Sequence, residues 1–221
     1  MLWSHAPTGT VADWGVSALV IVAGYILGCF APGYYLVRWR QNRDIRGRGS
    51  GSTGATNAGR ELGPTGFAVT FILDCAKGAL VGWMVMYFNL GPWASVLCAL
   101  AVVAGHIWPA QLRFRGGKGV ATLLGVLIVA DYRIILAMAG LFVIAFTWLR
   151  RFTLSGLAAI AATPPALAVA SPPPERALGL LLLVLPVLYA HRQNIRDDIG
   201  SLQAGLASRS SANPPTRKEQ L

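Results

Sequence analysis

Residues 92 to 130 indicate the fold, and they read PWASVLCALAVVAGHI, then WPAQLRFRGGK, then GVATLLGVLIVA. Two apolar segments flank a short connection that is rich in glycine and basic residues. Long apolar segments without charged residues are typical of helices that enter a lipid bilayer. The pattern therefore predicts membrane helices, joined by a loop whose glycine and basic residues are candidates for a functional site.

The same alternation continues along the whole chain. Seven apolar segments are predicted as helices, at residues 16–37, 64–88, 92–107, 119–130, 134–149, 154–170 and 177–190. Several are shorter than the roughly 20 residues of a full span, which snorkelling side chains and loops at the headgroup level can accommodate. We expect an all-α, polytopic integral membrane protein with about seven transmembrane helices. Residues 1–207 form its single domain, and residues 208–221 form a polar, disordered tail.

Composition agrees with a membrane protein. Of the 221 residues, 54% are hydrophobic and 13% charged, yet the net charge is +10. In a soluble protein this excess would suggest nucleic acid as a partner. Here the basic residues lie between apolar segments, so membrane topology explains them and the lipid bilayer is the expected partner, with no nucleic acid. The three cysteines lie inside apolar segments and show no spacing typical of a metal site or a disulfide.

The distribution of charge predicts the orientation. Sixteen of the nineteen Lys and Arg residues fall in alternate loops or in the tail, whereas Arg133 and Arg176 fall in the opposite loops and Lys77 inside a helix. Basic loops stay on the cytoplasmic side of the membrane. The N-terminus is therefore expected outside, and the C-terminus and both glycine-rich loops in the cytoplasm.

The first glycine-rich loop, at residues 46–60, reads RGRGSGSTGATNAGR. Glycine lets backbone amides gather round an anion, and hydroxyl and guanidinium groups complete such a site. The candidate anion ligands are Ser50, Gly51, Gly54, Thr56, Asn57 and Arg60. Thr56 and Arg60 are one helical turn apart, so both can face the same anion at a helix N-terminus. The alternative is a flexible linker between two helices.

The second loop ends in Gly116, Gly117, Lys118 and Gly119, directly before an apolar helix. The spacing differs from a P-loop, which needs GxxxxGK followed by Ser or Thr, but amides and one lysine suit phosphate oxygens here as well. The alternative is a basic anchor to lipid headgroups, an interpretation that fits Arg113 better than Lys118.

Five further polar residues need an explanation. Asp74 and Lys77 are three residues apart within an apolar segment, a spacing that favours an internal ion pair over a catalytic role. His191 and Asn194 share a face where the last apolar segment meets the cytoplasm, and we assign both to the phosphate site. His106 precedes a predicted helix end, where an imidazole can cap carbonyl groups. No cluster of carboxylates suggests a metal ion.

Together these motifs resemble the bacterial acyl-phosphate:glycerol-3-phosphate acyltransferases, the PlsY family. The resemblance rests on GSGSTGATN at residues 49–57 with Arg60, LDCAKG at 73–78, GHIWP at 105–109, FRGGKGVAT at 114–122, and His191 with Asn194 and Ile195. Ser52 stands where the family usually has Asn, and Ala190 where an Arg commonly precedes the histidine. Residues 196–200 follow the family pattern only loosely.

The resemblance implies an acyltransferase of phospholipid biosynthesis in the bacterial plasma (inner) membrane, with a cytoplasmic active site and no cofactor. A fatty acyl group would pass from acyl phosphate to the 1-hydroxyl of glycerol 3-phosphate, which implies a functional link to an enzyme that produces acyl phosphate. The catalytic residues would be Ser50, Thr56, Arg60, Lys118 and His191, with Gly51, Gly54, Asn57, Gly116, Gly117, Gly119 and Asn194 binding phosphate. The proton of the hydroxyl passes either to His191 or to a phosphate oxygen of the donor, the route we favour.

Two other functions fit part of this pattern. A transporter of small anions or organophosphates could use the same basic loops as a gate, but transporters usually contain internal repeats and polar residues near the membrane midplane. A lipid-binding scaffold without catalysis would not need Ser50, Thr56 and Lys118 to converge. The concentration of polar residues on one side of the membrane favours the enzyme.

Overall fold

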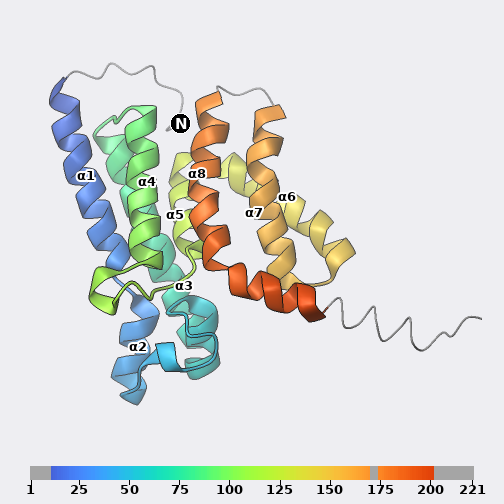
Figure 1. Ribbon diagram of the computed structural model, residues 1–221. Coiled ribbons are helices and arrows are strands. Elements are labelled where there is room, and N and C mark those ends of the chain that lie inside the picture. Colours follow the sequence, from blue (N-terminus) through green and yellow to red (C-terminus); the bar gives the residue numbers. More distant parts are fainter. Residues whose placement is uncertain (1–10, 170–173, 202–221) are drawn as a thin grey trace, which may run out of the picture.

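The computed structural model describes residues 11–169 and 174–201, and all regular elements within these ranges are helices. The expected all-α fold is confirmed (Figure 1). The elements are α1 (Val11–Cys29), α2 (Pro32–Gln41), η1 (Ile45–Gly47), α3 (Ala55–Tyr87), α4 (Pro92–Ile107), η2 (Ala110–Leu112), α5 (Val120–Ala130), α6 (Tyr132–Leu149), α7 (Phe152–Val169) and α8 (Pro174–Ala190). A short helix, Arg192–Ser201, follows α8. The expected tail at residues 208–221 lies outside the described residues.

All seven predicted apolar segments are helical, but they differ in their capacity to cross a membrane. Within the described part of the chain, five helices are long and apolar enough to span, and the bent pair formed by Arg176–Ala190 and Arg192–Ser201 makes up to six. The remaining segment, α5, has only 11 residues. At 1.5 Å per residue it is too short to cross the roughly 30 Å hydrocarbon core alone. It is instead packed inside the bundle, with Leu123 and Leu127 fully buried.

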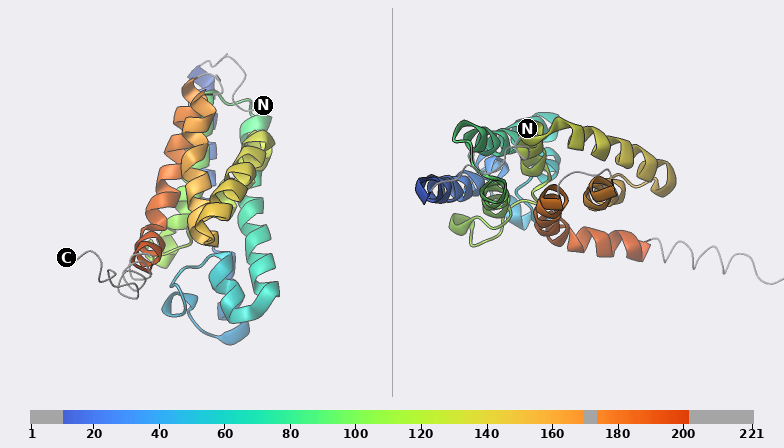
Figure 2. Two further views of the ribbon diagram at one scale, coloured as in Figure 1. Left: turned by 90° about the vertical axis from the view of Figure 1, so that its right-hand side faces the viewer. Right: turned by 90° about the horizontal axis from the view of Figure 1, so that it is seen from above.

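Two breaks in the helices shape the end of the molecule that carries the glycine-rich loops. The first predicted segment divides at Phe30 and Ala31, and α2 starts with Pro32, which is well suited to a first helical turn. The second break lies inside α3, where Gly63 has φ 72° and ψ −166°, a conformation essentially restricted to glycine. This break separates the start of α3 from its long apolar part (Figure 2). The predicted helix start at Pro64 is therefore a bend, and the helix begins nine residues earlier.

Glycines bring the helices that carry the site into close contact. On α1 and α4, Gly28 and Gly105 lie against each other, and a Cβ atom on either would overlap the backbone of the partner helix. Gly78 on α3 and Gly125 on α5 allow a second close approach of the same kind. Small residues drive helix association in bilayers because they let the backbones approach and gain van der Waals contact.

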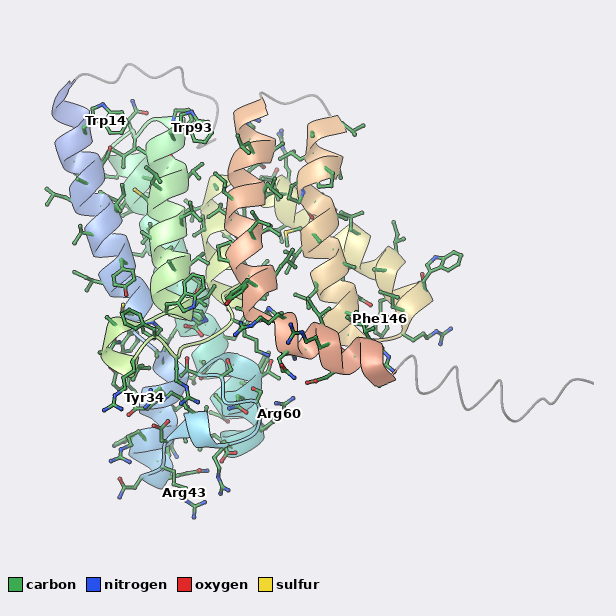
Figure 3. All side chains as sticks on the ribbon, viewed as in Figure 1. Trp14, Tyr34, Arg43, Arg60, Trp93 and Phe146 are labelled. Atoms are coloured by element: carbon green, nitrogen blue, oxygen red, sulfur yellow. The ribbon has the colours of Figure 1, made fainter. Side chains whose placement is uncertain are left out.

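The two ends of the bundle differ in chemistry. Trp14 and Trp93 lie at one end, while Arg43 and Arg60 lie at the opposite end, with the glycine-rich loops (Figure 3). Between the ends, large apolar side chains such as Leu19 and Leu136 are exposed by 72% and 64%. An exposed apolar belt between a basic end and an end without these arginines is the surface expected of a protein in a bilayer.

Candidate active site

The first loop is held by an ion pair at its start. Asp44 accepts a hydrogen bond from the backbone N–H of Arg46, and its carboxylate lies 2.6 Å from the Arg46 guanidinium. This contact lowers the pKa of Asp44 and raises that of Arg46. The same guanidinium donates to the carbonyl oxygen of Leu112 at 2.7 Å. Because Leu112 ends η2, the ion pair joins the first glycine-rich loop to the segment that leads into the second.

Asn57 gives the first loop its shape. Its side-chain amide donates to the carbonyl oxygens of Ser52 at 2.9 Å and Arg48 at 3.1 Å, and its Oδ1 accepts from the N–H of Ser50 at 3.1 Å. Asn57 is only 1% exposed. Gly49 has φ +51°, and a Cβ there would overlap Asn57 Oδ1. The polar atoms of Asn57, which we expected to bind phosphate, are thus engaged in holding Ser50 in place.

The second loop folds back on the end of α4. The N–H of Gly116 donates to Ile107 at 3.1 Å, and the N–H of Gly117 donates to His106 at 2.9 Å. The carbonyl of Gly116 in turn accepts from the N–H of Thr53, which joins the two loops directly. The expectation that the amides of Gly116 and Gly117 hold phosphate is not met, because both amides already have carbonyl partners. Their role is to shape the loop that presents Lys118.

Lys118 meets the C-terminal motif. Its ammonium donates to the side-chain oxygen of Asn194. The Lys118 pKa is below its usual value, chiefly because the side chain is partly buried and secondarily because Arg60 is close. Lys118 therefore contributes a partly desolvated cation, which interacts with an anion more strongly than a cation in water.

His191 lies at a bend of 63° between Arg176–Ala190 and Arg192–Ser201. Its Nδ1 lies 2.8 Å from the carbonyl oxygen of Val187, which can only accept, so Nδ1 carries the proton. In the neutral ring Nε2 is then a free acceptor. Burial lowers the His191 pKa, and the nearby Lys118 ammonium acts in the same direction. The side chain is thus neutral at pH 7.

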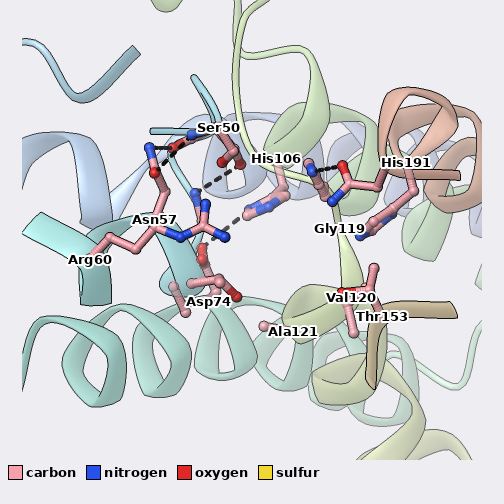
Figure 4. A pocket seen from close by; sticks show the side chains of 16 residues that line it. Ser50, Asn57, Arg60, Asp74, His106, Gly119, Val120, Ala121, Thr153 and His191 are labelled. Carbon is pink, nitrogen blue, oxygen red and sulfur yellow. Dashed lines mark hydrogen bonds and ion pairs between the residues drawn. The ribbon is translucent and has the colours of Figure 1, made fainter. Parts of the chain in front are cut away.

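One cavity of about 150 Å³ brings the three motifs together (Figure 4). Nine of the twelve predicted site residues line it, whereas Gly51, Gly116 and Gly117 do not. The nine are Ser50, Gly54, Thr56, Asn57, Arg60, Lys118, Gly119, His191 and Asn194. Thr56 and Arg60 lie one turn apart at the start of α3 and both face the cavity, as predicted. Arg113 is exposed and does not line it.

Seven residues that line the cavity were not among the predicted site residues, namely Ser52, Ala55, Asp74, His106, Val120, Ala121 and Thr153. The expected ion pair between Asp74 and Lys77 is confirmed, with 2.8 Å between Oδ1 and Nζ. The interpretation of His106 as a cap for carbonyl groups is wrong. Its Nδ1 lies 3.1 Å from Asp74 Oδ1 and 2.8 Å from Lys77 Nζ. The sequence contained one sign of this cluster. Asp74, Lys77 and His106 are ionisable residues within apolar segments, and such groups are generally paired.

The family model described as glycerol-3-phosphate acyltransferase matches residues 18–199, which include every residue that lines the cavity. The chain belongs to this family. It is 49% identical over 183 residues to glycerol-3-phosphate acyltransferase 1 of Desulfitobacterium hafniense (strain Y51), which covers 82% of the chain and 90% of the relative. It is 39% identical over 179 residues to glycerol-3-phosphate acyltransferase of Synechococcus sp. (strain CC9902), covering 81% and 90%.

Solved structures agree with this family membership. The chain superposes with a TM-score of 0.76 and 29% identity on the crystal structure of PlsY (YgiH), an integral membrane glycerol 3-phosphate acyltransferase, in its glycerol 3-phosphate form. A second structure of PlsY, in its lysophosphatidic acid form, matches with a TM-score of 0.72 and 28% identity. Each match covers 84% of this chain and 92% of the solved chain. The chain is thus an integral membrane protein of this acyltransferase family.

Proposed function

We propose that this protein transfers a fatty acyl group from acyl phosphate to the 1-hydroxyl of glycerol 3-phosphate and releases lysophosphatidic acid and inorganic phosphate. The observation that carries the proposal is the convergence of both glycine-rich loops and the His191 bend on one cavity. Two cations, Arg60 and Lys118, line this cavity together with the hydroxyls of Ser50 and Thr56. A site of this composition suits two phosphate-bearing substrates, and family membership names the acceptor.

The first phosphate lies against the start of α3. Ser50 and Thr56 supply hydroxyl donors, Arg60 supplies a guanidinium, and the N-terminus of α3 favours negative charge. Asn57 holds the backbone of Ser50 through its hydrogen bond, so this hydroxyl is presented by a fixed loop. Asn57 therefore acts as a positioning residue for Ser50.

The second phosphate lies against Lys118 and the start of α5 at Gly119. Lys118 also stabilises the negative charge that develops on the acyl carbonyl oxygen during attack. A donor aimed at developing charge in a water-poor site is among the largest contributions to catalysis. Asn194 accepts from Lys118 and so directs the ammonium.

The reaction needs positioned substrates more than a covalent nucleophile on the protein. The 1-hydroxyl oxygen of glycerol 3-phosphate forms a bond to the acyl carbonyl carbon, and the bond from that carbon to the phosphate oxygen breaks. The hydroxyl proton passes to a phosphate oxygen of the donor and leaves with inorganic phosphate. His191 Nε2 accepts a hydrogen bond from the second hydroxyl of glycerol 3-phosphate, which orients the acceptor and leaves the proton of the 1-hydroxyl for the donor phosphate. Because acyl phosphate is a mixed anhydride with a good leaving group, holding both substrates in line accounts for much of the rate.

The charge pattern supports a cytoplasmic position of the site in a bacterial plasma (inner) membrane. Both loops lie at the basic end of the bundle, and basic loops remain cytoplasmic. Acyl phosphate then reaches the cavity from the inner leaflet, and glycerol 3-phosphate from the cytoplasm. An enzyme that produces acyl phosphate is the functional partner.

Purified protein in detergent tests the proposal when it is supplied with acyl phosphate and labelled glycerol 3-phosphate. We expect labelled lysophosphatidic acid without acyl-CoA and without added Mg²⁺. Activity with acyl-CoA alone would contradict the choice of donor. The same preparation in liposomes distinguishes the enzyme from a transporter. Uptake of labelled glycerol 3-phosphate into the liposomes without product formation would contradict an enzyme.

A further inference from the structure

Three ionisable side chains beneath the cavity have no part in the proposed phosphate contacts. Asp74, Lys77 and His106 are exposed by only 1%, 5% and 4% at their side chains. Ionisable groups within membrane helices are costly, and they persist where they are paired or serve function. Two of the three, Asp74 and His106, line the cavity. Their contacts lead from the end of α1 to the loop that carries Lys118.

Lys77 fastens the end of α1. Its ammonium donates to the carbonyl oxygens of Gly28 at 3.0 Å and Phe30 at 2.7 Å. The carbonyls at a helix C-terminus have no backbone partner within the helix, so a cation is favourable there. The amide of Gln111 donates to the carbonyl between them, at Cys29. The end of α1 is therefore joined to α3 and to η2, which leads into the second loop.

Asp74 connects Lys77 with His106. Its Oδ1 lies 2.8 Å from Lys77 Nζ and 3.1 Å from His106 Nδ1, and Nζ lies 2.8 Å from Nδ1. A buried carboxylate is tolerated when a cation and further donors surround it, because they offset its loss of hydration. The three protons of the Lys77 ammonium already face oxygens of Gly28, Phe30 and Asp74. Nδ1 of His106 therefore carries a proton and donates to Asp74.

His106 in turn supports the second loop. Its backbone oxygen accepts from the N–H of Gly117 at 2.9 Å. A Cβ atom on Gly117 would overlap the imidazole ring, with Nε2 as its nearest atom. The ring and the Gly117 backbone are therefore in direct contact, and Lys118 is the next residue. A rotation of the ring would displace the backbone from which the lysine extends.

We propose that Asp74, Lys77 and His106 form a positioning network that sets the place of the Lys118 ammonium in the cavity. Lys77 holds the carboxylate of Asp74, Asp74 holds the imidazole, and the imidazole contacts the backbone at Gly117. The three residues act through Lys118 and not on the reacting atoms, although Asp74 and His106 line the cavity. The inference rests on the role proposed above for Lys118. Catalytic groups need such support, because a displacement of about 1 Å can lower a rate by roughly 10²-fold.

A double-mutant cycle between His106 and Gly117 tests the contact itself. Gly117→Ala and His106→Ala are each expected to lower kcat at saturating substrates by roughly 10²-fold, since each displaces the loop. In the His106→Ala background, adding Gly117→Ala is expected to cost less than about threefold, because the ring that the new methyl group would meet is gone. A double variant whose loss in kcat equals the product of the two single losses would overturn the proposal.

A pair of substitutions at His106 separates polar positioning from simple packing. His106→Gln keeps an amide that can donate to Asp74, whereas His106→Leu keeps a similar volume without a polar atom. We expect the Gln variant to retain at least about tenfold more activity, the scale of one hydrogen bond to a charged group. Activity is expressed per folded protein, from size-exclusion profiles and thermal unfolding in the same detergent. Equal activity of the two variants would overturn the network.

Two further variants separate the possible failures. Thr163→Ala removes another buried hydrogen bond, from Oγ1 to Ala159 on α7, and is expected to leave kcat and KM unchanged. If this control lost activity, the losses in the His106 and Gly117 variants would be explained by general destabilisation, and the network would be overturned. If Lys118→Ala is impaired while the His106 and Gly117 variants are normal, the network alone is wrong. If Lys118→Ala retains full activity, both the proposed site and the network are wrong.

Discussion

Lys118 donates a hydrogen bond to the side-chain oxygen of Asn194, which lies 76 residues further along the chain. Asn194 belongs to the short helix after the bend at His191, and Asp198 on the same helix forms an ion pair with Arg151 at 3.1 Å. The lysine is therefore directed by a helix that is itself attached to the connection between α6 and α7. This relationship explains how a motif near the C-terminus takes part in a site built mainly from the two glycine-rich loops.

The pH dependence of the reaction reports the state of His191. Burial lowers its pKa below the usual value near 6.5, so the ring is neutral at pH 7 and protonates only in more acidic solution. We expect kcat/KM to fall when the pH drops below 6.5, because a protonated Nε2 no longer accepts from the second hydroxyl of glycerol 3-phosphate. The measurement is a pH profile compared with that of His191→Gln, in which only the ionisation of the substrate phosphates remains. An acidic limb above pH 6.5 that vanishes in this variant would contradict the lowered pKa.

The same shift has a consequence for stability. The folded state binds this proton less readily than the unfolded chain, so the contribution of His191 is fully present above pH 6.5. It is lost as the pH falls through the folded pKa. Thermal unfolding in detergent should therefore show a smaller loss of stability on acidification for His191→Gln than for the parent protein. An equal or larger loss in the variant would contradict the direction of the shift.

Asn57→Ala should lower both stability and activity. The substitution removes the donors to Ser52 and Arg48. The buried Ser52 carbonyl loses this hydrogen bond, a loss of about 1–3 kcal/mol, whereas the Arg48 carbonyl keeps the N–H of Gly51 as a donor. It also releases the backbone of Ser50, so activity per folded protein should fall as well. Ser95→Ala is the matched control, since it loses buried hydrogen bonds to Leu90 and Gly91 at the opposite end of the bundle. Unchanged activity of Asn57→Ala per folded protein would show that the loop keeps its shape without the amide.

Labelling of single cysteines tests the position of the site relative to the membrane. In a chain whose three native cysteines are replaced, Asn89→Cys, at the turn between α3 and α4, should react with an impermeant maleimide in intact cells. Ser50→Cys and Lys118→Cys should react only after the membrane is permeabilised, because the basic end is expected to face the cytoplasm. Labelling of Ser50→Cys and Lys118→Cys from opposite sides would contradict a shared cavity.

The sequence predicted the helices well, because apolar segments and the alternation of charge are local signals. The two departures that change the shape of the bundle both involve proline. Apolar residues continue through Phe30 and Ala31, so the break before Pro32 is hidden within one apolar segment. At Gly63 and Pro64 the residue types are those of a helix boundary, yet the helix resumes after a bend. Packing decides between an end and a bend, and local residue preferences do not contain that information.

For the site, residue types indicated which side chains gather but not what each one contacts. Spacing of four residues correctly placed Thr56 and Arg60 on one face of α3. His191 and Asn194 both line the cavity, but a bend of 63° lies between His191 and the helix that carries Asn194. The amides of Gly116 and Gly117 were assigned to phosphate, whereas they donate to α4. That α4 partner could not be anticipated, because it depends on how the loop folds back. The meeting of His106 with Asp74, 32 residues away, depends likewise on the packing of α4 against α3.

Acyl transfer by Lys118→Ala and Arg113→Ala, measured side by side with acyl phosphate and glycerol 3-phosphate, tests whether the shared cavity is the site of catalysis. Lys118→Ala should lower kcat by roughly 10²-fold or more, and Lys118→Arg should recover little, since a planar guanidinium does not replace a compact ammonium. Arg113→Ala should retain nearly full activity, because Arg113 is exposed outside the cavity and can contact only headgroups, worth about 1 kcal/mol each. Equal losses in the two alanine variants, in proportion to the amount of inserted protein, would contradict a catalytic Lys118 and make both residues membrane anchors.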